Sequence, residues 1–190
     1  MSIFHKLLVS SLTAVALIAP AAFPVVAHDD TTTETSHKEN RNRSAVYFLL
    51  DEKAVAGFGH AALLVGDESG WDYYSFGPHS TKHPRENNLV HEHFETLADA
   101  CSSKDLRRYT KQLCWTARDA RKMDAVRQRI LKDWDNSSYN LLTRNCFHMV
   151  ADAVSAGSFD IDKHHAAPVS AFKANETKAR GHGAWPVAQH

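Results

Sequence analysis

The chain has 190 residues, 43% of them hydrophobic, and its 22 Lys and Arg balance 22 Asp and Glu. A chain of this length can bury one proper core, so a single domain is expected. The lack of net charge argues against a nucleic-acid partner, for which basic residues would dominate one face.

The first residues have the pattern of a secretory signal peptide. Lys6 supplies a short basic start, residues 7–19 are almost all apolar, and Val25 and Ala27 fit the small-residue pattern of a cleavage site. We therefore expect residues 1–27 to be removed, which predicts a secreted or periplasmic protein without a permanent membrane span. An uncleaved N-terminal anchor is the alternative interpretation.

Polar segments border the predicted domain at both ends. Residues 28–43 lack apolar anchors, which predicts a disordered leader. The segment 176–190 is weakly patterned and is predicted to be a flexible C-terminal tail, although Trp185 and Pro186 are candidates for docking it. The folded domain is therefore expected to span residues 44–175.

A strand and a hairpin are predicted in the first half of the domain. The apolar and aromatic run at residues 45–50 is typical of a buried strand. Residues 57–66, GFGHAALLVG, contain a strand that begins at His60, and residues 71–76, WDYYSF, form the returning strand after a turn. The histidine-containing stretch 77–92 is predicted to be an exposed loop.

Helices are predicted to dominate the second half. A short helix at 94–101 is followed by a strand at 109–115, and apolar residues at helical spacing run from Met123 to about Asn136. After a further helix comes an irregular segment that contains Pro168. This order predicts an α+β domain, with a small antiparallel sheet covered on one side by helices.

The stretch 139–157, YNLLTRNCFHMVADAVSAG, predicts a helix that begins at a cysteine. Asn145 is a good N-cap residue, because its side-chain oxygen can accept from a first-turn N–H. Cys146 then takes the first helical position, where the helix dipole and the unpaired N–H groups favour the thiolate. We interpret Cys146 as a nucleophile; a small buried residue under the helix is the alternative.

The three cysteines are expected to divide into one pair and one free thiol. Cys101 and Cys114 are close in sequence and flank a polar loop, so they are predicted to form a disulfide in an oxidising compartment. Cys146 is then left free, as a nucleophile requires.

A cysteine nucleophile needs a base that titrates near neutrality, and histidine meets that need without a cofactor. Most histidines of this chain lie in polar segments. His60 instead begins an apolar strand beside two glycines, which makes it the candidate base. A hydrogen-bonded structural histidine is the alternative.

The motifs GFGHAALLVG and YNLLTRNCFHMV together resemble the circularly permuted branch of the papain-like, NlpC-type superfamily, which includes lecithin retinol acyltransferase-like proteins. In that branch a histidine at the start of a strand precedes a cysteine at the start of a helix. The resemblance covers roughly residues 45–157. It implies a permuted papain-like fold in which Cys146 is the nucleophile and His60 the general base.

The resemblance also implies residues around this pair. A polar residue on the following strand should orient the imidazole; Ser75 is the first choice and His79 the second, since no acid, asparagine or histidine stands at the expected place. Tyr139 resembles a tyrosine that lines the site, with a packing tyrosine as the alternative. Asn145 matches the asparagine-cysteine pair of the branch and is assigned with Tyr139 to substrate binding.

The function implied is that of an exported cysteine hydrolase, an amidase or peptidase that forms an acyl-enzyme, with cell-wall peptides as candidate substrates. A lipid acyl hydrolase or acyltransferase is the alternative in the same branch. Such an enzyme should show an exposed apolar groove, of which the sequence gives no sign.

Two further alternatives are a metal-binding or sensor protein and a catalytically silent binding module. His91-x-His93 and His164-His165 suggest the first, but neither has the sequence context of a closed zinc site, so no metal is assigned. The sequence carries no signal for the oligomeric state.

Overall fold

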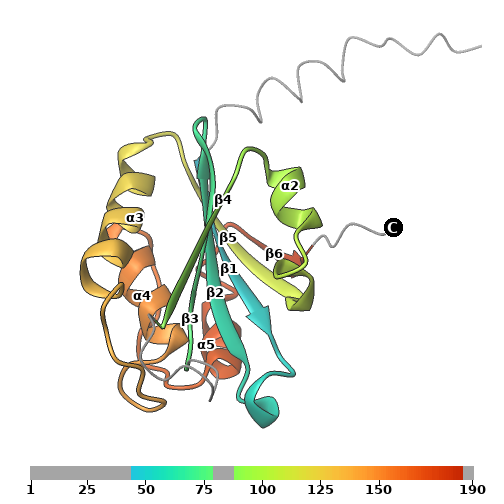
Figure 1. Cartoon of the computed structure of the whole chain (residues 1–190), viewed down its shortest axis with the longest axis vertical. Helices are drawn as coiled ribbons and strands as arrows, with labels where there is room; N and C mark the ends of the chain where they lie inside the picture. Colours follow the sequence, from blue (N-terminus) through green and yellow to red (C-terminus); the bar gives the residue numbers. More distant parts are fainter. Residues whose placement is uncertain (1–43, 79–87, 186–190) are drawn as a thin grey trace, which may run out of the picture.

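The apolar runs predicted as strands pair into one antiparallel sheet. The computed structural model describes residues 44–78 and 88–185. Within them the sheet has six strands in the order β4-β3-β2-β1-β5-β6 (Figure 1). These strands are, in chain order, β1 Ser44–Asp51, β2 His60–Asp67, β3 Gly70–Phe76, β4 Leu89–Phe94, β5 Lys111–Ala117 and β6 Gly181–Ala184. The predicted α+β class, with helices packed against an antiparallel sheet, is confirmed.

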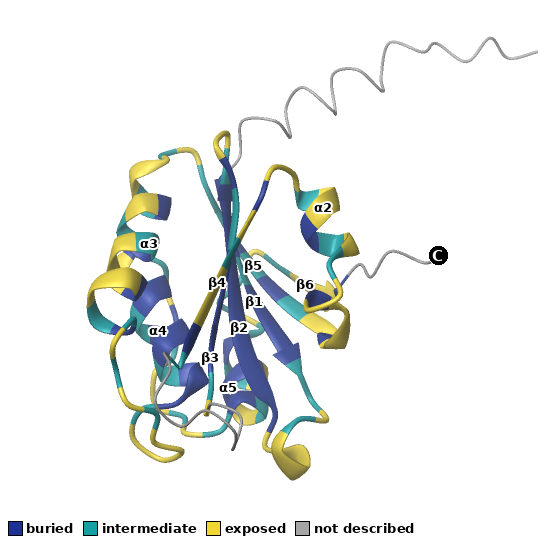
Figure 2. Cartoon of the chain, in the orientation of Figure 1, coloured by how far each residue is buried: buried dark blue, intermediate teal, exposed yellow. Residues whose placement is uncertain are grey.

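The central strands β1 and β2 are buried along nearly their whole length (Figure 2). Side chains alternate between the two faces of a sheet. Phe48 and Leu63 therefore enter one core, while Leu49 and Leu64 enter a second, smaller core on the other face. Both faces of these strands are covered, which is why their sequences read as continuous apolar runs.

Three helices cover the first face: α3 Arg121–Asp133, α4 Cys146–Ala156 and α5 Pro168–Asn175. Figure 1 shows α3 and α4 packed side by side on that face. α4 is the most apolar of them, and Phe147 and Val150 are fully buried. α5 lies in a segment predicted to be irregular. It begins at Pro168. Proline is tolerated at the start of a helix because an N–H group there would make no intrahelical hydrogen bond.

The opposite face carries α2 Leu97–Ser102 and the 3₁₀ turn η2 Leu106–Arg108, which corrects the expectation that helices cover only one side. Leu106 and Tyr109 anchor this layer in the second core. A second 3₁₀ turn, η1 Val55–Gly57, lies in the exposed connection between β1 and β2.

Two edge strands differ from the expectations for their segments. β4 occupies part of the segment predicted to be a loop. The sequence gives little sign of this strand because it lies at the edge of the sheet, is exposed along much of its length and has only a weak apolar pattern. β6 occupies part of the predicted flexible tail, and the next residue, Trp185, is 4% exposed and lies with its ring centroid 5.7 Å from that of Tyr47. The folded domain therefore extends through Trp185, beyond the predicted limit at residue 175.

Several expectations concern residues that the structure does not describe. The predicted signal peptide 1–27, the leader 28–43 and His79 lie outside the described residues. Among the helices that are described, none combines the length and the apolar character that a membrane span requires.

Candidate active site

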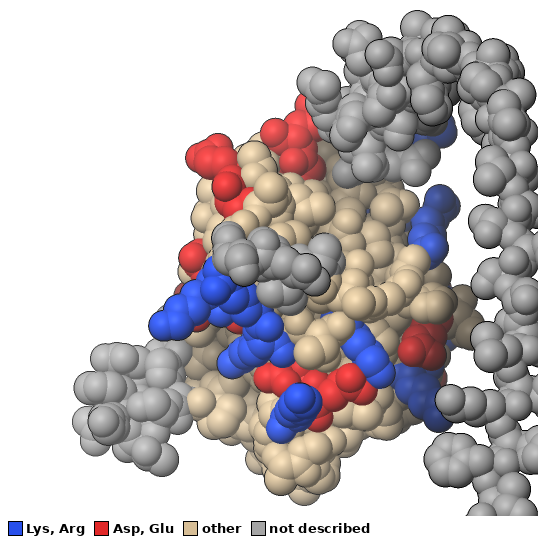
Figure 3. All heavy atoms as spheres, turned by 90° about the vertical axis from the view of Figure 1, so that its right-hand side faces the viewer, with Lys and Arg blue, Asp and Glu red and all other residues tan. Residues whose placement is uncertain are grey.

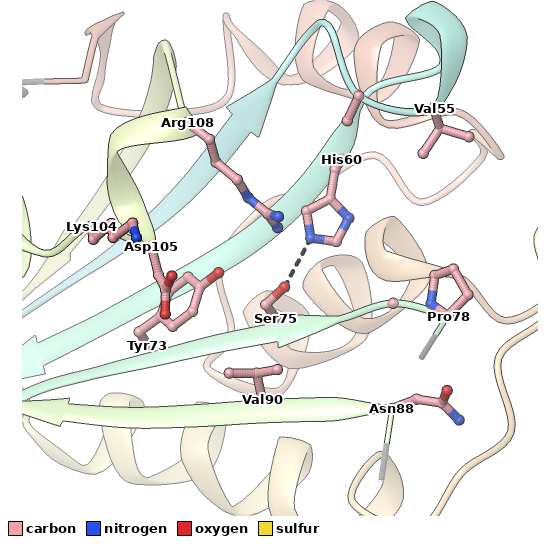
Figure 4. Close-up of a pocket in the computed structure, with 12 residues that line it drawn as sticks. Val55, His60, Tyr73, Ser75, Pro78, Asn88, Val90, Lys104, Asp105 and Arg108 are labelled. Carbon is pink, nitrogen blue, oxygen red and sulfur yellow. Dashed lines mark hydrogen bonds between the residues drawn. The ribbon is translucent and has the colours of Figure 1, made fainter. Parts of the chain in front are cut away.

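The hairpin β2–β3 brings His60 and Ser75 together. Ala62 lies opposite Ser75 in the register of the two strands, so His60 is the diagonal neighbour of Ser75 on the same face of the sheet. The Nε2 atom of His60 lies 2.8 Å from Ser75 Oγ, and both side chains are buried (Figure 4). The residue chosen to orient the imidazole is thus in contact with it.

α4 begins at Cys146 because Asn145 caps the helix, as its sequence position predicts. The Asn145 Oδ1 atom accepts from two first-turn N–H groups at 2.9 and 3.2 Å. Its amide nitrogen donates to the carbonyl groups of Leu141 and Ala166, both at 2.7 Å. Every hydrogen-bonding position of this side chain is used inside the protein. Asn145 therefore positions Cys146, and the assignment of Asn145 to substrate binding is corrected.

The sulfur of Cys146 lies at the backbone next to His60. Its Sγ atom accepts from the N–H of Ala61 at 3.4 Å. A Cα atom lies about 2.4 Å from the amide nitrogen of the next residue, so the sulfur is within about 6 Å of the His60 Cα atom. In the described part of the chain no hydrogen bond joins the sulfur to the imidazole, which is engaged by Ser75 instead. The sulfur is thus near the backbone of His60, but Cys146 belongs to the first core, while the imidazole packs with Ser75 and with Tyr109 of the second core.

Tyr139 lies near enough to Cys146 for the charge of a thiolate to act on its hydroxyl. Burial, and then the charge that Cys146 would carry, raise the pKa of Tyr139 to about 12. The Tyr139 ring packs with its centroid 5.6 Å from that of Phe76. Tyr139 is therefore within range of the charge of Cys146 and is at the same time a packing residue.

Burial sets the protonation state of His60, the candidate base. Burial, followed by the nearby charge of Arg108, lowers the pKa of His60 from 6.5 to about 3. The imidazole is therefore neutral near pH 7.

Burial also decides the state of the thiol. It raises the pKa of Cys146, although the N–H groups of Ala61, Phe147 and Cys146 itself and the charge of Arg108 act in the opposite direction. The sequence-based expectation that the helix start favours the thiolate is wrong for the resting state, because the residue is only 2% exposed and loses its solvation. In the resting state the thiol is therefore protonated and the imidazole is neutral.

A cavity of about 500 Å³ opens on the His60 side of the sheet (Figure 4). Cys146 is not among its lining residues and is only 2% exposed, so the sulfur is not accessible from the cavity in this state. The side chains that give the cavity its chemistry are His60, Ser75, Tyr73, Lys104, Asp105 and Arg108.

Sequence reasoning missed Lys104 and Arg108. They belong to a short polar connection with no periodic pattern, and only the fold places it over the strand that begins at His60. The one local signal is Leu106 between them, a lone apolar residue that anchors the connection in the second core.

The predicted disulfide between Cys101 and Cys114 is not formed in the structure, where both are free thiols. Cys114 lies opposite Tyr47 in the β1–β5 pair and is hydrogen-bonded to its hydroxyl. Burial raises the pKa of both thiols, which keeps them protonated. The two cysteines thus share the surroundings of Tyr47 without being joined.

The histidines that suggested a metal site have other partners. His91 Nε2 and His93 Nδ1 lie 3.1 and 2.9 Å from the same oxygen of Asp72. The other Asp72 oxygen accepts from Arg127 at 2.7 Å, so a cation already compensates this carboxylate. Across residues 44–78 and 88–185, no group of three or more His, Cys, Asp or Glu side chains is placed to hold a metal ion.

The site as a whole joins a thiol, an imidazole held by a hydroxyl, and a cavity with two cationic side chains. A thiol beside an oriented imidazole can carry out nucleophilic acyl transfer. Comparison of the chain with protein-family models, curated proteins and solved structures gives no match. The evidence for its chemistry therefore comes from the geometry of the site.

Proposed function

We propose that this protein is an exported cysteine hydrolase of the permuted papain-like type, an amidase or peptidase that acts on peptides such as those of the cell wall. The observation that carries the proposal is the meeting of two motifs at the start of β2. The sulfur of Cys146 accepts from the N–H of Ala61, while the imidazole of the preceding residue, His60, is held by Ser75. In the permuted branch, too, the histidine on the strand precedes the cysteine on the helix in the sequence.

The hydrogen bond to Ser75 supports a role for His60 as the base. With its proton on Nε2, the imidazole donates to Ser75 Oγ and has a free lone pair on Nδ1. Nδ1 then takes the thiol proton of Cys146 as the sulfur attacks the carbonyl carbon of the substrate. Because burial disfavours both charged forms in the resting state, the thiolate forms only as the sulfur attacks.

Attack forms a carbon–sulfur bond and moves an electron pair onto the carbonyl oxygen. The backbone N–H of Cys146, at the start of α4, is the donor that stabilises this oxyanion. The Nδ1–H of the imidazolium protonates the leaving amine as the carbon–nitrogen bond breaks, which leaves a thioester. Water attacks the thioester while His60 takes its proton, and the acid is released with the thiol restored.

A second candidate function, a lipid acyl hydrolase on the same fold, is favoured by the rim of the cavity. Val55 and Val90 both line it and are 49% and 48% exposed. Val55 and the next residue, Ala56, have φ angles of 50° and 52°, a strained conformation for residues other than glycine. Exposed valines at the mouth of a cavity are suited to contact an acyl chain.

Purified protein should be incubated separately with peptidoglycan fragments and with phospholipid vesicles, and the products identified by mass spectrometry. The amidase proposal expects new amine and carboxylate ends on the peptides, lost in Cys146→Ala and retained in Cys114→Ala. Free fatty acid from the vesicles would identify the lipid enzyme instead. No product from either substrate, with a folded protein, would favour the silent binding module.

A further inference from the structure

We propose that Arg108 and Lys104 form a subsite that binds a carboxylate group of the substrate inside the cavity. This inference rests on the proposed function and narrows its substrate class to peptides that carry a carboxylate close to the scissile amide. The proposal follows from the position of the two cations, their partners and the charges around them.

Both cations line the cavity that contains His60 and Ser75. Figure 4 shows the guanidinium of Arg108 pointing toward the imidazole of His60. Within the described residues neither cation has an ion pair, and the one hydrogen bond of the Arg108 guanidinium goes to the hydroxyl of Tyr109 at 2.9 Å. Arginine carries five N–H donors, so most of them are free to face a ligand.

Neutral groups hold the Arg108 side chain in place. Its Cζ atom lies 5.0 Å from the ring centroid of Tyr109, a cation–π contact. The Tyr109 hydroxyl is itself 2.9 Å from the hydroxyl of Tyr73, which also lines the cavity. These contacts order the guanidinium without cancelling its charge, so an anion that binds it meets a prepared group.

Two other arginines of this protein have guanidinium groups that are paired with carboxylates. Arg127 pairs with Asp67 and Asp72, and Arg129 pairs with Asp133 and with Asp152. Within the described residues no carboxylate forms an ion pair with Arg108, and the charge of Asp51 acts on its guanidinium only from a greater distance. A carboxylate from a ligand would supply such a pair, with the charge-assisted and bidentate geometry that a guanidinium favours.

The charge of the cavity is local and positive. Its lining holds two cations and one carboxylate, that of Asp105, and the charge of Asp51 also acts on Arg108 from outside the lining. On the α2 side of the molecule, the basic and acidic side chains of the described residues are interspersed and form no broad basic surface in view (Figure 3). Asp105 would weaken the binding of an anion in the cavity, because its carboxylate competes for the two cations.

The guanidinium is also coupled to the reacting groups. The charge of Arg108 contributes to lowering the pKa of His60 and opposes the rise in the pKa of the Cys146 thiol. A carboxylate bound to Arg108 would thus lie near the imidazole. It would neutralise part of the positive charge, raise the pKa of His60 and make it a stronger base.

The test measures binding in the inactive full-length variant Cys146→Ser, so that turnover plays no part. The probes are the amides of N-acetyl-Ala-Glu and N-acetyl-Ala-Gln, which have nearly the same shape and differ by one charge. Calorimetry should show that the glutamate probe binds tighter by about tenfold, and that added salt reduces the difference. Chemical shifts of the imidazole should show the pKa of His60 rising with the glutamate probe.

Neighbouring residues supply the control variants. Arg108→Gln should remove the preference for the glutamate probe, and Lys104→Gln should reduce it. Arg107→Gln should leave it unchanged, because the Arg107 side chain donates to the carbonyl of Ser102 and does not line the cavity. Asp105→Asn should strengthen binding of the glutamate probe by removing the competing carboxylate.

Equal binding of the two probes would overturn the subsite. So would an equal loss of the glutamate preference in Arg108→Gln and Arg107→Gln. Binding to phosphatidylglycerol vesicles that depends on Arg108, with no preference between the peptides, would assign the cation to a lipid phosphate and overturn it as well. A glutamate preference without hydrolysis by the wild type would support the subsite and count against the proposed function. Hydrolysis of both peptides at equal kcat/KM would count against the subsite alone.

Discussion

The Nε2 atom of His60 lies 2.8 Å from Ser75 Oγ across the diagonal of the β2–β3 pair. The two residues are joined by a tight hairpin, so the register of the strands sets their separation. A slip of one residue would turn one of the two side chains to the other face of the sheet. The orientation of the imidazole is therefore a property of the sheet itself.

Ser75→Ala should lower kcat by about tenfold to a hundredfold with a smaller change in KM, because the imidazole loses the group that aims it. Ser75→Thr keeps a hydroxyl and should restore most of the activity. Ser44→Ala, at another buried strand serine, is the control for general effects on the sheet. If Ser75 had only a structural role, kcat would fall equally in the Ala and Thr variants, and the fall would follow their loss of stability.

The thiol of Cys146 should titrate above the ordinary thiol pKa of about 8.5, since burial raises its pKa. The rate of alkylation by iodoacetamide, measured against pH in a Cys101→Ser, Cys114→Ser background, should rise with a midpoint above that value. His60→Gln should shift the midpoint little, because the imidazole is already neutral across that range. A midpoint below pH 7 that moves upward in His60→Gln would show a preformed thiolate–imidazolium pair.

His60 should make the fold sensitive to mild acid. Its pKa is about 3 in the folded state and 6.5 in the unfolded chain, so the unfolded state binds the proton more readily. The contribution to stability is complete above pH 6.5 and is lost as the pH falls toward 3. Urea unfolding at pH 7 and 4.5 should show a loss of about 2 kcal/mol that is absent in His60→Gln. Equal losses in the two proteins would place the acid sensitivity elsewhere.

Asn145→Ala should destabilise the protein by about 1–3 kcal/mol, because it removes a helix cap and the donor to the carbonyl groups of Leu141 and Ala166. Asn145→Asp keeps the cap acceptor and loses the donors to Leu141 and Ala166, so the two variants separate these contributions. Urea denaturation gives the free energies of unfolding. If Asn145 bound substrate, KM would rise in both variants while stability stayed near that of the wild type.

Trp185→Ala should destabilise the domain by about 2–4 kcal/mol, since the residue is 4% exposed and packs against Tyr47. Thermal unfolding measures the loss. His182→Ala, in the exposed part of β6, is the matched substitution and should have little effect. An unchanged midpoint for Trp185→Ala would restore the view of this segment as a flexible tail.

The sequence by itself determined the features that depend on near neighbours in the chain. The hairpin, and with it the contact of His60 and Ser75, follows from two apolar strands separated by a tight turn. The start of α4 follows from the capping chemistry of Asn145, which acts within one helical turn. The α+β class follows from the order of these elements.

Only the tertiary structure decided the features that depend on distant parts of the chain. The pKa of Cys146 is raised because residues far away in sequence exclude water from the sulfur, and this outweighs the local effect of the helix start. Arg108 enters the cavity because η2 docks on the opposite face of the sheet from α4, and β6 exists only because β5 offers it an edge. Burial and long-range charge are sums over residues that no short pattern brings together. This is why the His60–Ser75 contact and the helix start at Cys146 could be predicted from the sequence, while the electrostatics of these residues could not.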